Sequence, residues 1–518
     1  MSEAFHSSLK KAVTGTVLIF FGSAGGLLFW FFSKIIIVRS LTQEEFGLYS
    51  LALAIVSIVA LAAGLGLPDG VSRYISISIG EGNERNAKSL AAESIKIAAI
   101  SGLVCFLLVF ILSGFISRGI FFKPALTRPL KFLSLYIPLG AIVPVYLAIL
   151  RGYGVIKVKS FADFGTPLVF CFFLGLFHMF LGLSLMNIIY AFVLSVGVLF
   201  AATATYEFKR IGSYYTRGKG ESFARDVLGF SLPLLIVGVL GVVFGWTDTL
   251  MLGRYTNPED VGVYNVGISI ARLLLFPIAA LEFVFMPLAG DLYGKSQLSE
   301  LKKLYQVLTK WIFSATFPIF LILFLFPEMV VTFLFADRFL NAALPLRILS
   351  LGFLINAFLG TNSVVMLVMG MSRHLMNIAI FGAILNVLLN YVFIKQMGLS
   401  IVGSAVATAF SYFACNIAVS IFLYKKSGVH PITKNYLYPV ASTVVITLII
   451  YGIAKSLPLS AWMLPLYFIL FIGCYIASFV ITRSLDHEDI LIFESVSQRT
   501  GLEMRLIRKI FYKSTLQK

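Results

Sequence analysis

Seven charged residues lie within or beside long apolar stretches of the sequence, where charge is uncommon. Three are cations and four are carboxylates: Lys34, Arg73 and Arg272, and Asp69, Asp163, Asp248 and Glu282. A charged side chain at membrane depth is costly, so it usually faces a cavity or a partner. Three cations beside one water-filled cavity would attract an anion, and Arg suits phosphate because its planar fork donates paired hydrogen bonds. We therefore treat Lys34, Arg73 and Arg272 as candidates for a substrate cavity.

The carboxylates are candidates for ion coupling or for pairing within the cavity. Asp248 would limit the positive field of the cavity, and it could take up H⁺ or Na⁺ during a transport cycle. Glu282 could pair with Arg272 or take part in proton coupling. Asp69 and Arg73 are four residues apart, which is the spacing of a local ion pair on a helix.

Helix position leaves a structural alternative open for some of these residues. Lys34, Arg73 and Asp163 lie near predicted helix ends, where long side chains can extend to the membrane surface instead of lining a cavity.

Enzymatic motifs are missing from the sequence. No glycine-rich loop is followed by Lys and Ser/Thr, and no His-Glu-x-x-His pattern occurs. The four cysteines are widely spaced among apolar neighbours, which is typical of small core residues: Cys105, Cys171, Cys415 and Cys474. We expect no enzyme activity, no cofactor and no metal site. Energy for any transport would come from an ion gradient, the membrane potential or the substrate gradient.

The composition is that of an integral membrane protein. Hydrophobic residues make up 59% of the 518 positions and charged residues 13%, whereas soluble proteins carry about 25% charged residues. The net charge of +17 would suggest nucleic-acid binding in a soluble protein. In a membrane protein, positive charge gathers on cytoplasmic loops, so no nucleic-acid partner is expected.

Apolar runs of membrane-spanning length predict about fourteen transmembrane helices in an all-α polytopic fold. Their ranges are about 13–38, 44–67, 87–115, 129–150, 161–182, 185–206, 227–253, 260–290, 299–326, 343–369, 374–396, 400–424, 437–455 and 461–482. With an even helix number, most loop Lys and Arg fall on the side of both termini. The positive-inside rule then places both termini in the cytoplasm of a multi-pass protein of the cell membrane.

An internal repeat connects the two halves of the chain. Residues 21–55 align without a gap on residues 236–270, at a constant offset of 215. The alignment pairs Arg39 with Arg254 and Tyr49 with Tyr264, and chance similarity between apolar segments is the alternative. Paired helices run the same way across the membrane, so the prediction is a parallel repeat of two six-helix lobes, which would place a substrate path between them. The expected domains are 1-208 and 227-424 as the lobes, 209-226 as a cytoplasmic linker, 425-482 as two appended helices and 483-518 as a cytoplasmic tail. The tail predicts an amphipathic helix on the membrane lipids, with a solvated tail as the alternative.

Several loose motifs carry a resemblance to a known family. They are the segments 41–52 (LTQEEFGLYSLA), 64–74 (GLGLPDGVSRY), 248–253 (DTLMLG), 261–266 (VGVYNV), 287–289 (PLA) and 335–347 (FADRFLNAALPLR). In order and spacing the chain resembles the polysaccharide flippases, including O-antigen flippases, of the multidrug/oligosaccharidyl-lipid/polysaccharide exporter superfamily. The resemblance implies two lobes forming a V and alternating access. It also implies a lipid-linked oligosaccharide substrate, whose sugar headgroup passes the cavity while its polyprenyl tail stays in lipid. Cavity cations of this family hold the lipid phosphate or acidic sugars, a role that Lys34, Arg73 and Arg272 would fill by position.

Three functions remain open at this stage. A flippase for lipid-linked oligosaccharides, acting as a monomer, is the favoured one. An ion-coupled drug or cation antiporter of the same superfamily would want an acidic cavity, which Asp163, Asp248 and Glu282 could provide. A membrane glycosyltransferase or polymerase would need a large loop with acidic catalytic residues. The longest loop, after residue 208, is basic, so this third function is the least favoured.

Overall fold

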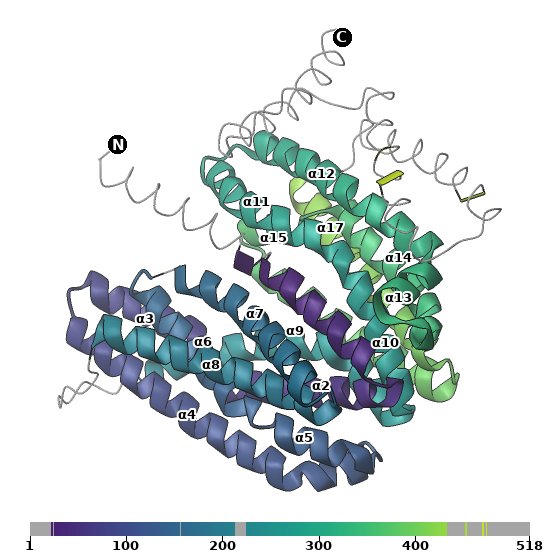
Figure 1. Cartoon of the computed structure of the whole chain (residues 1–518). Coiled ribbons are helices and arrows are strands. Elements are labelled where there is room, and N and C mark those ends of the chain that lie inside the picture. Colours follow the sequence, from purple (N-terminus) through teal and green to yellow (C-terminus); the bar gives the residue numbers. More distant parts are fainter. Residues whose placement is uncertain are drawn as a thin grey trace. The chain divides into compact units, whose positions relative to one another are not determined.

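The computed structural model describes residues 22–23, 25–155, 157–212, 224–431, 451–452, 469–470 and 473 (Figure 1). Within these residues the chain is helical and contains no strand. Ten of the described helical runs are long and apolar enough to cross a membrane. The prediction of an all-α polytopic membrane protein is therefore confirmed. Apart from residues 451–452, 469–470 and 473, the predicted helices at 437–455 and 461–482 and the tail at 483–518 lie outside the described residues, so the count of fourteen stays a prediction.

The helices follow one another with short connections. In the first half they are α2 (Gln43–Ala63), α3 (Leu67–Gly80), α4 (Glu84–Phe115), α5 (Thr127–Leu133), α6 (Tyr136–Gly152), α7 (Lys157–Phe180) and α8 (Leu185–Ile211), preceded by a helix over residues 25–40. In the second half they are α9 (Ala224–Tyr255), α10 (Pro258–Ala271), α11 (Phe276–Gly294), α12 (Leu298–Leu325), α13 (Pro327–Phe335), α14 (Ala343–Leu359), α15 (Asn362–Val368), α16 (Ser372–Asn390) and α17 (Ser400–Ser427). Short 3-10 or π segments join some of them: η1 (Ile116–Ile120), η2 (Pro124–Leu126), η3 (Arg272–Leu275), η4 (Asp337–Ala342) and η5 (Tyr391–Gln396).

The described part of the chain divides into two compact units. The first contains the described residues up to Asn265 together with Asn386–Ser404, and the second contains Val266–Leu385 and the described residues from Ala405 onward. In the first unit, α3, α4 and α6 pack against one another (Figure 1). Their shared core is formed by small and branched apolar side chains such as Val71, Ile75, Ala91 and Ile149.

An exposed apolar surface runs along α4. The side chains Ile100, Leu103, Leu107, Leu108, Ile111 and Phe115 are all exposed. A continuous apolar surface of this kind has no reason to face water, and lipid is the solvent that suits it. The arrangement agrees with a membrane-spanning α4.

The connection between α2 and α3 differs from the prediction. The sequence predicts that a membrane helix ends at residue 67, yet the chain is helical again from Leu67 to Gly80. The break is confined to Gly64–Gly66, and Gly66 has a left-handed backbone with φ of 66°. Pro68 does not end the helix, because the first turn of a helix needs no donor from its backbone nitrogens.

The helix starts recur at the offset found in the sequence. Gln43 and Pro258 start α2 and α10, Lys157 and Ser372 start α7 and α16, and Leu185 and Ser400 start α8 and α17, each pair 215 residues apart. These starts agree with the predicted repeat and extend it well beyond the aligned segment, although the repeat itself stays a prediction.

A close crossing of α2 and α10 follows the same offset. A side chain at Gly47 would meet the carbonyl oxygen of Pro258, and one at Gly262 would meet the carbonyl oxygen of Gln43. Gln43 corresponds to Pro258 and Gly47 to Gly262, so the contact is the same in both directions. Only glycine lets the two backbones approach this closely.

Candidate functional site

Asp248 lies at the centre of a buried polar network in the first unit. Its side chain is 3% exposed. The hydroxyl of Tyr264 donates to one carboxylate oxygen at 2.5 Å, and the side-chain amide of Asn390 donates to the other at 2.8 Å. Ser404 donates to the amide oxygen of Asn390 at 2.6 Å. We call Asp248, Tyr264, Asn390 and Ser404 the Asp248 network.

Four helices supply these side chains, and a further hydrogen bond joins two of the helices, α9 and α10. Asp248 belongs to α9, Tyr264 to α10, Asn390 to the end of α16 and Ser404 to α17. One residue further along, the amide of Asn265 donates to the hydroxyl of Thr249 at 3.1 Å, again between α10 and α9. The hydroxyl of Ser400 donates to Asp260 at 2.6 Å. Positions 248 and 264, and 249 and 265, therefore face each other across the α9–α10 pair.

The Asp248 network is chemically suited to stabilise an ionised carboxylate and to bind a small cation at it. A buried carboxylate without partners would be very unfavourable, and two donors on opposite oxygens compensate the ionised form. An entering H⁺ or Na⁺ would compete with those donors for the same oxygens. Hydroxyl and amide oxygens of Tyr264, Asn390 and Ser404 are hard oxygen donors of the kind that small cations accept.

Lys34 lies on the helix over residues 25–40 and is half-buried. Its ammonium group lies 5.8 Å from the ring centroid of Phe46 on α2, which is a cation–π contact. The preceding residue, Ser33, is fully buried, donates to the carbonyl of Phe29 and contacts the sulfur of Cys171 at 3.0 Å. The structure thus packs Ser33 against α7 and leaves Lys34 partly accessible.

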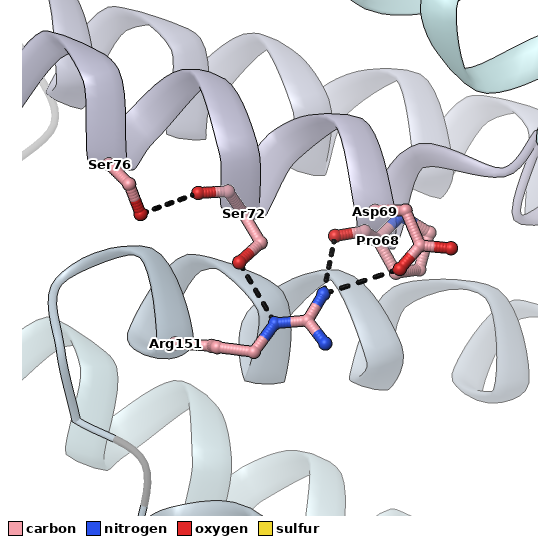
Figure 2. Close-up of polar contacts among 5 residues, drawn as sticks. All are labelled: Pro68, Asp69, Ser72, Ser76 and Arg151. Atoms are coloured by element: carbon pink, nitrogen blue, oxygen red, sulfur yellow. Dashed lines mark hydrogen bonds and ion pairs between the residues drawn. The ribbon is translucent and has the colours of Figure 1, made fainter. Parts of the chain in front are cut away.

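Asp69 and Arg73 do not form the ion pair predicted along their own helix. Asp69 instead contacts Arg151 of α6, as Figure 2 shows. The guanidinium nitrogen and the carboxylate oxygen are 3.4 Å apart. Arg151 also donates to the carbonyl of Pro68 at 3.2 Å and to the hydroxyl of Ser72 at 2.8 Å. The cluster ties the start of α3 to the end of α6, where a cation is favoured by the helix dipole. Arg73 is exposed.

Asp163 pairs with a neighbour on its own helix. Lys159, one turn earlier on α7, lies 2.7 Å from its carboxylate, and the hydroxyl of Ser23 donates to the same oxygen at 2.9 Å. Gly22, Gly25 and Gly26 allow the first helix to pack closely on α7 here. This carboxylate therefore holds two helices together.

Arg272 and Glu282 belong to the second unit. Arg272 starts the 3-10 segment η3, which joins α10 to α11. Pro277, in the first turn of α11, explains why α10 does not continue into α11 as one α-helix. Proline lacks the backbone N–H of the helical hydrogen bond, and its ring clashes with the carbonyl group four residues earlier. Arg272 is exposed and Glu282 is half-buried. Glu282 forms no ion pair within the described residues, so the predicted pairing with Arg272 is not found there.

A family model described as "Polysaccharide biosynthesis protein" matches residues 36–344, which is more than half of the chain. The chain belongs to the polysaccharide biosynthesis protein family. The match covers the helices that carry all seven predicted site residues except Lys34, which lies two residues before it. The family relationship expected from the loose motifs is thereby confirmed.

Individual proteins are also similar to this chain in sequence or in structure. A "Probable low-salt glycan biosynthesis flippase Agl15" of Haloferax volcanii is 22% identical over 409 residues, covering 77% of this chain and 80% of its own. The structure resembles that of "Lipid II flippase MurJ", with a TM-score of 0.72 over 91% of this chain and 98% of that chain at 12% identity. It also resembles an inward-facing "multidrug resistance MATE family transporter of the MOP superfamily", with a TM-score of 0.67 over 78% of this chain and 94% of that chain at 20% identity. The chain therefore shares its fold with these transporters.

Three buried charges among the described residues were not among the predicted site residues, and one of them is Lys123, which is 9% exposed. Lys310 on α12 is 4% exposed and Glu207 on α8 is 1% exposed. Lys310 falls inside a predicted membrane helix, so its charge alone could have identified it. Glu207 falls one residue beyond the predicted helix 185–206, and it lies on α8 because that helix continues to Ile211. The neutral members of the Asp248 network carried no charge signal, and nothing in the sequence brings Asn390 to Asp248.

Proposed function

We propose that the chain is a flippase that moves lipid-linked oligosaccharides from the cytoplasmic to the outer leaflet of the cell membrane, for the assembly of a surface glycan. Membership of the polysaccharide biosynthesis protein family carries the proposal. A relative described as a probable glycan flippase and a fold similar to that of a lipid II flippase support it. The substrate is a sugar linked to a lipid phosphate, and both termini lie in the cytoplasm.

In the proposed mechanism the three cations recognise the anionic part of the substrate. Lys34, Arg73 and Arg272 provide donors for a phosphate or an acidic sugar, and the exposure of Arg73 and Arg272 and the partial exposure of Lys34 support this role. The two lobes alternate between inward and outward openings, while the polyprenyl tail stays in lipid. The Asp248 network is the proposed ion-coupling site, where H⁺ or Na⁺ competes with Tyr264 and Asn390 for the carboxylate.

A reconstituted flipping assay tests this function. Proteoliposomes would carry a fluorescent polyprenyl-linked oligosaccharide, and a membrane-impermeant quencher outside would report the protected fraction. We expect the protein to abolish the protected fraction, and Lys34→Ala or Arg272→Ala to slow flipping by about tenfold or more, because each removes a charged contact to the anion. Lys303→Ala is the matched control, because Lys303 is exposed and already pairs with Glu300 at 3.3 Å.

The second candidate function is an ion-coupled drug or cation antiporter, which the buried carboxylate of Asp248 and the likeness to a multidrug transporter favour. The same proteoliposomes separate the two. Gradient-driven uptake of an organic cation that Asp248→Asn abolishes, together with no movement of several lipid-linked oligosaccharides, would replace the flippase proposal with the antiporter.

A further inference from the structure

A row of alternating rings and cations lies in the first unit, apart from the Asp248 network. Its members are Phe122, Arg254, Tyr255, Lys395 and Tyr391, and we call it the cation–aromatic row. The guanidinium of Arg254 lies 4.3 Å from the ring centroid of Phe122 and 5.6 Å from that of Tyr255. The ammonium of Lys395 lies 5.5 Å from the ring centroid of Tyr255 and 5.0 Å from that of Tyr391. The two tyrosine rings meet edge to face with centroids 6.1 Å apart.

Three distant segments of the chain build this row. Phe122 comes from the connection between η1 and η2, Arg254 and Tyr255 from the end of α9, and Tyr391 and Lys395 from η5. Phe122 has a left-handed backbone with φ of 56°, which is rare for a residue with a large side chain, and the residue is 61% exposed. The loop therefore holds an apolar ring outside the core, beside a cation.

The charge around the row is positive and incompletely balanced. Neither Arg254 nor Lys395 forms an ion pair with a carboxylate among the described residues. Lys123 is a third cation nearby. Burial and the charge of Arg254 lower the pKa of Lys123, and only Glu259 opposes them. The other local carboxylate, Asp260, accepts a hydrogen bond from Ser400. Arg254 and Lys395 both lie against the ring of Tyr255, and Lys123 is close enough to Arg254 to be affected by its charge, so the site favours an anion.

The row lies where membrane spans end. Lys123 stands between the spans Glu84–Ile120 and Pro124–Gly152, Arg254 and Tyr255 precede the span that starts at Pro258, and Lys395 is next to the last residue of the span Ser372–Gln396. The segments contact one another, so these span ends share one side of the membrane. Tyr, Lys and Arg at such positions meet the lipid headgroups. At that depth of a membrane, the abundant anionic group is the phosphate of a lipid.

We propose that the cation–aromatic row is a binding site for the phosphate group of a membrane lipid. Arg254 and Lys395 contact the phosphate, and the rings of Phe122, Tyr255 and Tyr391 hold the two cations in place and meet the upper part of the lipid chains. The phosphate belongs either to an ordinary anionic phospholipid or to a polyprenyl phosphate. The site requires neither source to be transported, so it does not depend on the proposed function.

Native mass spectrometry of the purified full-length protein in a neutral detergent tests the site, because it counts the lipids bound to each protein molecule. The probes are phosphatidylglycerol, a polyprenyl monophosphate and the zwitterionic phosphatidylcholine. We expect both anionic lipids to bind more tightly than phosphatidylcholine, and the double variant Arg254→Gln/Lys395→Gln to weaken their binding by about tenfold or more, as expected for the loss of hydrogen bonds to a charged group. A polyprenyl phosphate that binds at least tenfold more tightly than phosphatidylglycerol would identify the substrate lipid class as the source. Similar affinities would identify a structural lipid.

Two further variants keep the test specific. Arg254→Lys/Lys395→Arg retains both charges and should retain binding, which separates lost contacts from misfolding. Lys295→Gln/Lys303→Gln removes the same charge from cations that already pair with Asp291 and Glu300, and it should leave binding unchanged. Equal binding by the wild type and the Arg254→Gln/Lys395→Gln variant, or an equal loss in the Lys295→Gln/Lys303→Gln control, would overturn the proposal.

Discussion

The hydroxyl of Tyr264 should stabilise the fold measurably, and the phenylalanine variant isolates that effect. Tyr264 is fully buried, and its hydroxyl donates at 2.5 Å to the carboxylate of Asp248. A hydrogen bond to a charged group contributes about 1.5–3 kcal/mol in water-soluble proteins. Hydrogen bonds between membrane helices average about 0.6 kcal/mol, with a maximum near 1.7. Because Asn390 still donates to Asp248 in the variant, we expect Tyr264→Phe to lower the free energy of unfolding by about 1–2 kcal/mol.

The chain offers a matched control for this measurement. Tyr49 stands 215 residues before Tyr264, also buried, but its hydroxyl makes no hydrogen bond within the part of the chain that the structure describes. Tyr49→Phe removes the same atom without removing a hydrogen bond, so its effect should be under about 0.5 kcal/mol. Both free energies can be measured by unfolding in mixed micelles, followed by tryptophan fluorescence.

A double-mutant cycle assigns the effect to the pair. In an Asp248→Leu background the acceptor of Tyr264 is gone, so Tyr264→Phe should cost much less than in the wild type. An equal cost of Tyr264→Phe in the two backgrounds would refute the assignment. So would a cost of Tyr49→Phe that matches that of Tyr264→Phe.

Three other predictions concern packing, a helix connection and pH. Gly47→Val or Gly262→Val should destabilise the protein by roughly 1–3 kcal/mol or more in thermal unfolding, because the new side chain meets a backbone carbonyl. Gly165→Ala is the control, because its new side chain meets nothing within 4 Å, and it should be neutral or slightly stabilising. Arg151→Gln should lower the free energy of unfolding by less than about 1 kcal/mol, because the Arg151 side chain is 48% exposed and solvent screens its contact with Asp69. A larger loss would mean that the hydrogen bonds from Arg151 to Pro68 and Ser72 dominate. Burial and the charge of Arg254 lower the pKa of Lys123 from its usual 10.5. Between the lowered pKa and 10.5 the unfolded chain binds more protons than the folded chain, so the free energy of unfolding should rise with pH across that window. Lys123→Met should remove this rise, and an unchanged slope would contradict the reasoning.

The helices were predictable because long apolar runs have few other structures available in lipid. The predicted helix at 299–326 matches α12 within one residue at each end, and the one at 400–424 starts where α17 starts. The largest difference is α3 (Leu67–Gly80), because the predicted membrane helix 44–67 ends where α3 begins. Glycine and proline mark where a helix can break, but whether it restarts depends on packing. Here α3 packs against α4 and α6, which the local sequence does not encode.

The candidate site was predictable only in its charged members. Asp248 is recognisable because a carboxylate inside an apolar run is costly. Tyr264, Asn390 and Ser404 are ordinary residues for a membrane helix, and their role depends on which helices become neighbours. The pairing of Asp69 with Arg151 has the same cause. Helix spacing correctly allows Arg73 as a partner four residues away, but the end of α6 brings a better-placed cation to the same carboxylate.

The asymmetry between equivalent positions explains how one scaffold could serve two kinds of charge. At the predicted offset of 215, Ser33 and Lys34 correspond to Asp248 and Thr249, and Cys171 corresponds to Asn386. Ser33 contacts Cys171, a weakly polar pair that needs no countercharge and leaves Lys34 partly accessible over Phe46. The same place in the second half holds a carboxylate, and its helix neighbours supply the donors that a buried anion requires.

Under the proposed function this difference separates the two tasks. The first helix of the first half presents a cation to the substrate, while the corresponding helix of the second half holds a carboxylate for the coupling ion. Exchanging the residues would not exchange the tasks. An aspartate at Ser33 would meet the Cys171 thiol and the carbonyl of Phe29 instead of two good donors, so it would be a buried anion without compensation. The chemistry of each half therefore depends on the neighbouring helices as much as on the charged residue itself.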